Sequence, residues 1–222
     1  MLTLHHLENS RSHRILWLLE ELGVKYEMKF YERDPATKMA PPELREIHPL
    51  GKAPVVTDGD NTLAESAAII EYIVDRYGEG RLRPETDTPE YLRYQYWMHY
   101  AEGSAMTPIL LKVILGEFAR QAPLVARPVM KLVANMADKE YLDGQLALHM
   151  KYWEGELEDR SYFVADEFTA ADIQMIYPLE GALAATATPE EYPNLLDLVE
   201  RLRGREAYQK AVEVGGEVLF EL

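Results

Sequence analysis

The sequence predicts an α+β protein in which an N-terminal α/β domain is followed by an all-helical domain. Short stretches of alternating polarity are concentrated in the first 78 residues, and apolar residues at helical spacing dominate from residue 88 onward. Between them, residues 79–87 are polar, contain Gly80 and Pro84 and lack periodicity, which is typical of a linker. We therefore expect domains at residues 1–78 and 88–222.

The first domain begins with a strand, a helix and a second strand. Residues 2–6 alternate in polarity and predict the first strand. Residues 15–22 then place their apolar side chains on one face of a helix, which Gly23 ends. Residues 26–30 alternate again, and a short helix is expected near 43–47. A strand, helix and strand in this order predict a right-handed βαβ unit with parallel strands.

The stretch that follows, residues 48–57 (HPLGKAPVVT), leads into a strand but contains Pro54. Proline cannot donate to a sheet ladder, so Pro54 must lie at a strand start, an edge or a bend, and a cis bond before it would form such a bend. A bend there would leave the N–H and C=O of Ala53 free to pair outside the sheet. Asp58-Gly59 next predicts the turn of a hairpin.

A third helix is expected after Glu65 and Ser66, ending at Gly78. Its free N–H groups and dipole would favour a carboxylate, and Glu65 could hold an ammonium beside it. The α-carbon of an amino acid carries both groups, so this helix end suits an amino-acid ligand. The alternative is that Ser66 only caps the helix and Glu65 only suits its dipole.

Long helices are expected after the linker. Thr88 as N-cap with Pro89 in the first turn predicts the start of a helix rich in aromatic residues. Pro108 should bend or divide this helix, and Pro123 should end it. A second long helical stretch covers residues 128–159.

The remaining chain predicts three further helices. Thr169 and Asp172 have the spacing of a capping box, with Asp172 in place of the usual Glu or Gln, and they open the first. Residues 194–203 and 205–212 predict two shorter ones. Residues 162–164 form a short strand-like run, which does not change the prediction of an all-helical second domain.

The composition of the chain argues against several classes of function. The chain of 222 residues carries a net charge of −15 with no basic half, so it is not expected to bind nucleic acid. It contains no cysteine, so any thiol chemistry must use the sulfur of a ligand. The six histidines lack metal-site spacing, and we assign no metal. No signal-like segment or membrane-length apolar run appears, so we expect a cytoplasmic protein without a membrane anchor.

Taken together, these motifs resemble those of the cytosolic glutathione transferases over nearly the whole chain. Ala53-Pro54, Glu65-Ser66 and the Thr169–Asp172 box stand in the family's order, each weak alone and strong in combination. The serine-type fungal and bacterial branch is the most similar, through the segments NSRSHR at 9–14, HPLGKAP at 48–54 and AYQK at 207–210. The resemblance implies a thioredoxin-like first domain, glutathione as co-substrate and a homodimer.

The resemblance also implies roles for individual residues. A cis bend at Pro54 would present the backbone of Ala53 to the cysteinyl part of glutathione. Glu65 and Ser66 would hold the γ-glutamyl ammonium and carboxylate, and Lys52 the glycyl carboxylate, unless it is only a solvated loop lysine. The acceptor pocket is formed by variable side chains in this family, and our candidates for it are Tyr96, Tyr100 and Met106.

The resemblance implies that Ser10 stabilises the glutathione thiolate. For a thiol of pKa about 8.5 to be mostly ionised at pH 7, its pKa must fall by roughly two units, or about 2.7 kcal/mol. A helix N-terminus supplies about 0.3–1 kcal/mol, and a hydrogen bond to a charged group about 1.5–3 kcal/mol. A hydroxyl donor is therefore needed, and Ser10 is our choice. Asn9 and Ser12 compete with it, and the alternative role for Ser10 is helix capping.

The resulting prediction is a detoxifying glutathione transferase. The thiolate would attack a small hydrophobic electrophile, or glutathione would reduce a peroxide or disulfide. Ser10→Ala should then lower conjugation more at neutral pH than at pH 9. The competing reading is a non-catalytic protein of the same fold that binds a protein partner, such as the stringent-starvation type that associates with polymerase. A structural domain like those appended to translation factors is a third reading.

Overall fold

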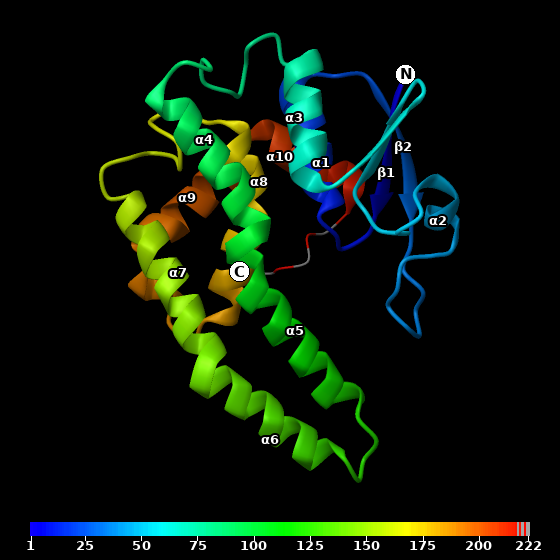
Figure 1. Ribbon diagram of the computed structural model, residues 1–222, viewed down its shortest axis with the longest axis vertical. Helices are drawn as coiled ribbons and strands as arrows, with labels where there is room; N and C mark the ends of the chain where they lie inside the picture. The colour runs from blue at the N-terminus through cyan, green and yellow to red at the C-terminus, as the bar shows by residue number, and fades with distance from the viewer. Residues whose placement is uncertain (217, 219, 221–222) are drawn as a thin grey trace.

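The computed structural model describes residues 1–216, 218 and 220. An N-terminal α/β domain lies beside a larger helical domain, as expected, and the two pack along α1, α3 and α8 (Figure 1). No helix among these residues is long and apolar enough to cross a membrane. The position of the linker at residues 79–87 stays a prediction.

The sheet of the first domain has four strands in the order β2-β1-β3-β4. Strands β1 and β2 are parallel, with Leu4 opposite Met28, as the βαβ prediction requires. Strands β3 and β4 run antiparallel and are joined by a turn in which Gly59 has φ +60°. The strands span β1 Leu2–Leu7, β2 Tyr26–Tyr31, β3 Val55–Asp58 and β4 Asn61–Ala64.

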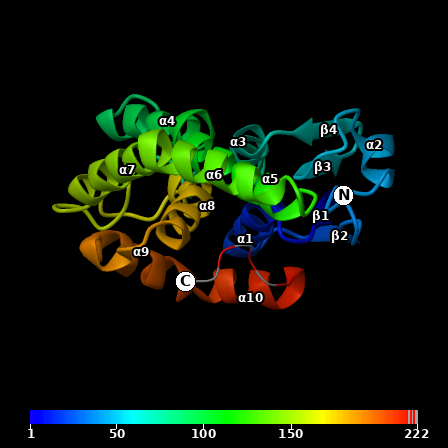
Figure 2. The same ribbon diagram turned by 90° about the horizontal axis from the view of Figure 1, so that it is seen from below.

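Three helices complete this domain: α1 Ser12–Leu22, the short α2 Glu43–Ile47 and α3 Ser66–Tyr77. Gly23 ends α1 in the left-handed conformation, which glycine adopts without steric cost. Helices α1 and α3 contact each other and also α8, Ala170–Ala185. Figure 2 shows α10, Glu206–Gly215, lying against α1.

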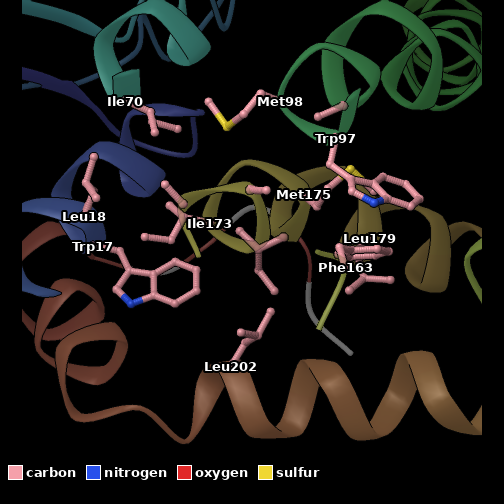
Figure 3. Close-up of a cluster of buried hydrophobic side chains, with 14 of the residues drawn as sticks. Trp17, Leu18, Ile70, Trp97, Met98, Phe163, Ile173, Met175, Leu179 and Leu202 are labelled. Carbon is pink, nitrogen blue, oxygen red and sulfur yellow. The ribbon is translucent and has the colours of Figure 1, made fainter. Parts of the chain in front are cut away.

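One hydrophobic core runs through both domains and centres on α8, which is buried over nearly its whole length. Figure 3 shows Trp17 and Ile70 of the first domain beside Ile173 of α8, in the same buried cluster as Trp97 and Leu202 of the second domain. Because the apolar faces of the two domains cover each other, their relative position is set by close packing rather than by the linker alone.

Two pairs of consecutive helices are joined by a short π-helical segment, which is wider than an α-helical turn. Helices α4, Pro89–Tyr100, and α5, Met106–Gln121, are joined by the π-helical segment η1, Ala101–Ala105. Pro108 was expected to bend or divide this helix. The helix is divided by η1, which ends three residues before Pro108, and α5 continues through the proline itself. The wide turn lies just before Pro108, where the proline lacks the N–H that an α-helical bond would use. A second π-helical segment, η2 Asp138–Leu142, joins α6 Arg127–Ala137 to α7 Asp143–Glu156.

The Thr169–Asp172 capping box is confirmed at the start of α8. Asp172 Oδ2 accepts from Thr169 N–H at 2.8 Å, and its Oδ1 accepts from Phe163 N–H at 3.0 Å. Residues 162–164 therefore form a loop pinned to α8, not a strand. Thr88 also caps α4 as predicted, accepting from Tyr91 N–H. The last helices are α9 Pro193–Arg203, preceded by the 3₁₀ turn η3 Pro189–Glu191, and α10.

Candidate functional site

A cavity of about 130 Å³ lies where the loop before β3 meets the start of α3. It brings together all five residues predicted to hold glutathione: Lys52, Ala53, Pro54, Glu65 and Ser66. The cavity is also lined by Arg11, just before α1, and by Glu102, in η1 of the helical domain. His48, Leu50 and Ala64 complete it. We call this cavity the hairpin pocket.

The loop side of the hairpin pocket offers backbone groups. The Ala53-Pro54 bond is cis, as expected. Pro54 is buried at the entry to β3, and Ala53 is half-buried. The turn and loop hydrogen bonds of the described residues do not use the Ala53 N–H or C=O. Both groups are therefore available to pair with an extended ligand.

The helix side of the pocket offers donors and an acid. The first intrahelical bond of α3 runs from Ile69 N–H to Glu65 C=O, so the N–H groups of residues 66–68 have no partner within the helix. Glu65 is exposed and adopts φ +71°. A non-glycine residue in this region costs of order 1–3 kcal/mol, and such residues cluster at ligand sites.

Ser66 does not cap α3 as the alternative reading supposed. It is the first residue of the helix, and no side chain caps that end. Its hydroxyl oxygen instead accepts from Arg14 Nη2 at 2.9 Å. A carboxylate bound at this helix end would meet N–H groups and a hydroxyl together.

Arg14 was not among the residues predicted from the sequence. Its guanidinium is 1% exposed and also donates to Gln174 C=O at 2.6 Å and to Glu102 Oε1 at 2.5 Å. Burial lowers the pKa of Arg14, opposed by the nearby Glu102 carboxylate. The available signal was its position, since Arg14 precedes Leu18 by four residues on the face of α1 that turns inward. A cation on such a face implies buried partners.

Ser10 lies outside the hairpin pocket. Its hydroxyl donates to Leu7 C=O at 2.8 Å and lies 2.8 Å from Ser12 Oγ, which in turn lies 3.0 Å from His6 Nδ1. Ser10 lines a separate cavity of about 10 Å³, which has room for one water at most. Its proposed contact with a thiol stays a prediction, as do those of Asn9 and Ser12.

The three acceptor candidates are not brought together. Tyr100 stacks on Tyr96, and its hydroxyl is bonded to His149 and receives a hydrogen bond from Trp153, so both tyrosines face α7. Met106 is buried in the core. None of the three lines the hairpin pocket. Tyr96 and Tyr100 take part in aromatic packing between α4 and α7, which helical periodicity alone cannot distinguish from a ligand groove.

Family models match both parts of the chain. The model of the glutathione S-transferase N-terminal domain matches residues 1–75, and that of the C-terminal domain matches residues 111–206. Glutathione S-transferase 3 of Schizosaccharomyces pombe is 37% identical over 96% of this chain and 87% of its own length. Glutathione S-transferase 1 of Saccharomyces cerevisiae is 31% identical over 96% of this chain and 94% of its own.

Solved structures agree with the fold. A glutathione S-transferase from Actinobacillus pleuropneumoniae superposes with a TM-score of 0.80 at 35% identity, covering 99% of this chain and 94% of that one. A glutathione transferase from Phanerochaete chrysosporium, in complex with oxidized glutathione, gives a TM-score of 0.75 at 23% identity, covering 96% of each chain.

Proposed function

The chain belongs to the glutathione S-transferase family and acts as a glutathione transferase, and we propose that the hairpin pocket is where it binds glutathione. The observation that carries this proposal is the convergence of Ala53, Glu65 and Ser66 on one cavity from segments separated by a hairpin. The bound thiolate attacks a small hydrophobic electrophile, forming a carbon–sulfur bond. Reduction of a peroxide or disulfide by the same thiol is a second use of the site.

Each part of glutathione has a matching group. The cysteinyl backbone pairs with the N–H and C=O of Ala53, in the manner of a short added strand. The γ-glutamyl carboxylate accepts from the first N–H groups of α3 and from the Ser66 hydroxyl. Its ammonium lies near Glu65. Lys52 is exposed at the rim and suits the glycyl carboxylate.

Local donors can bind the carboxylates of glutathione even though the chain carries −15. Arg11, Lys52 and the positive end of α3 all lie at the pocket. Charges farther than about 8 Å away are largely screened at physiological ionic strength. Glu65 and Glu102 also line the pocket, so binding of the glutathione carboxylates depends on their nearest partners, Lys52 and the N–H groups of α3.

We also propose that two copies associate through the hairpin formed by α5 and α6. This hairpin projects away from the rest of the molecule (Figure 1) and leaves many apolar side chains exposed. Residues 106–137 carry four basic and one acidic side chain, a net charge of +3, so the other residues carry −18. A contiguous group of exposed apolar side chains is typical of a protein–protein interface. The positive charge of the hairpin is opposite to the negative charge of the other residues, so the hairpin is attracted to those residues of a second copy. The exposed side chains include Phe118, Leu124, Val125, Val129, Leu132 and Met136.

Binding of glutathione and of an analogue without the α-amino group tests the site. Wild type should bind glutathione roughly 10-fold to 150-fold more tightly, since a hydrogen bond to a charged group is worth about 1.5–3 kcal/mol. Glu65→Gln should remove most of this preference, measured by calorimetry. Glu90→Gln, at an exposed glutamate on α4, is the matched control and should keep it.

Turnover with a chlorinated aromatic acceptor separates the two functional readings. A wild-type enzyme that binds glutathione should release chloride and form the thioether. Binding without turnover would favour the non-catalytic reading. Equal affinity of wild type for glutathione and the deaminated analogue would place the γ-glutamyl group elsewhere.

A further inference from the structure

The hydroxyl of Ser10 is poorly placed to donate to a ligand. A hydroxyl has one proton, and that of Ser10 is directed at Leu7 C=O at 2.8 Å. Its oxygen also accepts from Ser12 N–H at 3.2 Å. The side chain is buried, and the cavity beside it is too small for a cysteinyl sulfur.

Arg11, the next residue, lies in the hairpin pocket itself. Its side chain is 30% exposed and lines the same cavity as Ala53 and Pro54. The guanidinium carbon lies 5.5 Å from the centre of the Tyr177 ring on α8, and Nε lies 3.2 Å from Glu102 Oε1. Tyr177 and Glu102 thus hold the guanidinium at the pocket edge.

The charges around Arg11 leave one cation uncompensated. Arg11 and Arg14 both contact the same Glu102 oxygen. Arg14 is buried behind the wall, whereas Arg11 reaches the cavity, so the excess charge is available there. The other charged or titratable groups of the cavity are Glu65, Lys52 and His48, and Tyr177 packs behind Arg11.

We propose that Arg11, rather than Ser10, stabilises the thiolate of bound glutathione. The inference rests on the proposed binding of glutathione in the hairpin pocket. With its backbone held at Ala53 and its γ-glutamyl end at α3, the cysteinyl residue lies in the cavity that Arg11 lines. The thiol proton leaves to solvent, and the guanidinium, which stays protonated, donates to the sulfur.

Ser10 and Ser12 then act as positioning residues. Ser12 Oγ donates to Leu7 C=O, and His6 Nε2 is hydrogen-bonded to Gly215 C=O at 2.9 Å. These bonds hold the turn after β1 in place. This network fixes the backbone from which Arg11 extends. Its loss should move Arg11 and alter affinity, without removing the charge that stabilises sulfur.

The pKa of the bound thiol tests the inference. It is obtained by saturating the enzyme with glutathione and following the ultraviolet absorbance of the thiolate as the pH is varied. A free thiol has a pKa of about 8.5, and we expect about 6.5 in the wild-type complex. Arg11→Gln should return it toward 8.5, so the thiolate fraction at pH 6.5 falls roughly 50-fold. Arg11→Lys should give an intermediate value. Ser10→Ala and the control Arg160→Gln, at an exposed arginine, should shift it by less than about half a unit.

Glutathione affinity, measured in the same variants, separates this inference from the proposed function. If Arg11→Gln binds glutathione and keeps the low thiol pKa, the inference is wrong and the site stands. If Ser10→Ala raises the thiol pKa and Arg11→Gln does not, Ser10 stabilises the thiolate and the inference is overturned. If wild type does not bind glutathione, the proposed function fails, and the inference with it. Circular dichroism of each variant establishes that it is folded.

Discussion

Arg14 Nη2 donates to the hydroxyl of Ser66 at 2.9 Å, joining the first and third helices beside the hairpin pocket. Because the serine oxygen accepts this bond, its proton is free to point toward a ligand. The same guanidinium reaches Gln174 C=O on α8 and Glu102 in η1. One buried cation therefore sets the orientation of the Ser66 hydroxyl and also joins the two domains.

Replacing Arg14 with methionine should destabilise the protein by about 3–5 kcal/mol, because removing one partner leaves the buried groups around it unpaired. Urea unfolding measures the change. Arg160→Met, at an exposed arginine, is the matched control and should change stability by less than about 0.5 kcal/mol. The folded fraction of the Arg14 variant should also bind glutathione more weakly. Unchanged stability would show that Arg14 does not join the domains.

His13 should make stability depend on pH. Its ring packs against Tyr208, and burial, helped by nearby His6, lowers its pKa to about 4. The unfolded chain binds a proton below about pH 6.5 and the folded one does not, so stability present above that pH is lost as pH falls toward 4. Between pH 7 and 5 this costs about 2 kcal/mol.

The comparison that isolates His13 is wild type against His13→Phe, since the variant keeps a ring but cannot titrate. Urea unfolding at both pH values should show that wild type loses about 2 kcal/mol more than the variant. Other groups, such as buried Asp172, titrate alike in both proteins, so their contributions to the loss of stability cancel in the comparison. His99→Phe, at an exposed histidine, should behave like wild type. Equal losses in wild type and His13→Phe would mean that His13 is protonated in the folded state.

Asp172 should matter more than the threonine it partners. Burial raises its pKa to about 6, and three donors surround its carboxyl: Phe163 N–H, Thr169 N–H and Thr169 Oγ1. Asp172→Ala leaves these donors unpaired and should cost at least about 3 kcal/mol. Thr169→Ala removes one cap and should cost about 1 kcal/mol. Thermal and urea unfolding of both variants give the ranking, and a reversed order would contradict the geometry.

The α5–α6 hairpin should determine the oligomeric state. Light scattering should find wild type as a dimer and the double variant Val129→Glu/Leu132→Glu as a folded monomer, because the charges cannot be buried in an apolar interface. Leu92→Glu, at an exposed leucine of α4 outside the hairpin, is the control and should remain dimeric. A monomeric wild type, or a dimeric double variant, would exclude this surface as the interface.

Local patterns predicted most of the fold. The end of α1 at Gly23, the cap at Thr88 and the Thr169–Asp172 box depend on residues close in sequence, so the sequence displays them directly. An interruption of the helix near Pro108 was expected, but its form as a π-helical turn before the proline was not, because such a turn has no signature in residue type. Phe163 was read as part of a strand-like run, although its partner is a carboxyl nine residues away.

The sequence alone determined the order of elements, the dependence on a ligand's sulfur in a chain without cysteine, and the residues Ala53, Glu65 and Ser66 as a candidate site. Only the tertiary structure decided that Ser10 turns inward, that Arg11 faces the pocket and that Arg14 reaches Ser66. The reason is physical. Helix ends and turns follow from neighbouring residues, whereas the direction of a side chain at a domain boundary depends on partners such as Glu102, which lies about 90 positions away and meets them only in the folded chain.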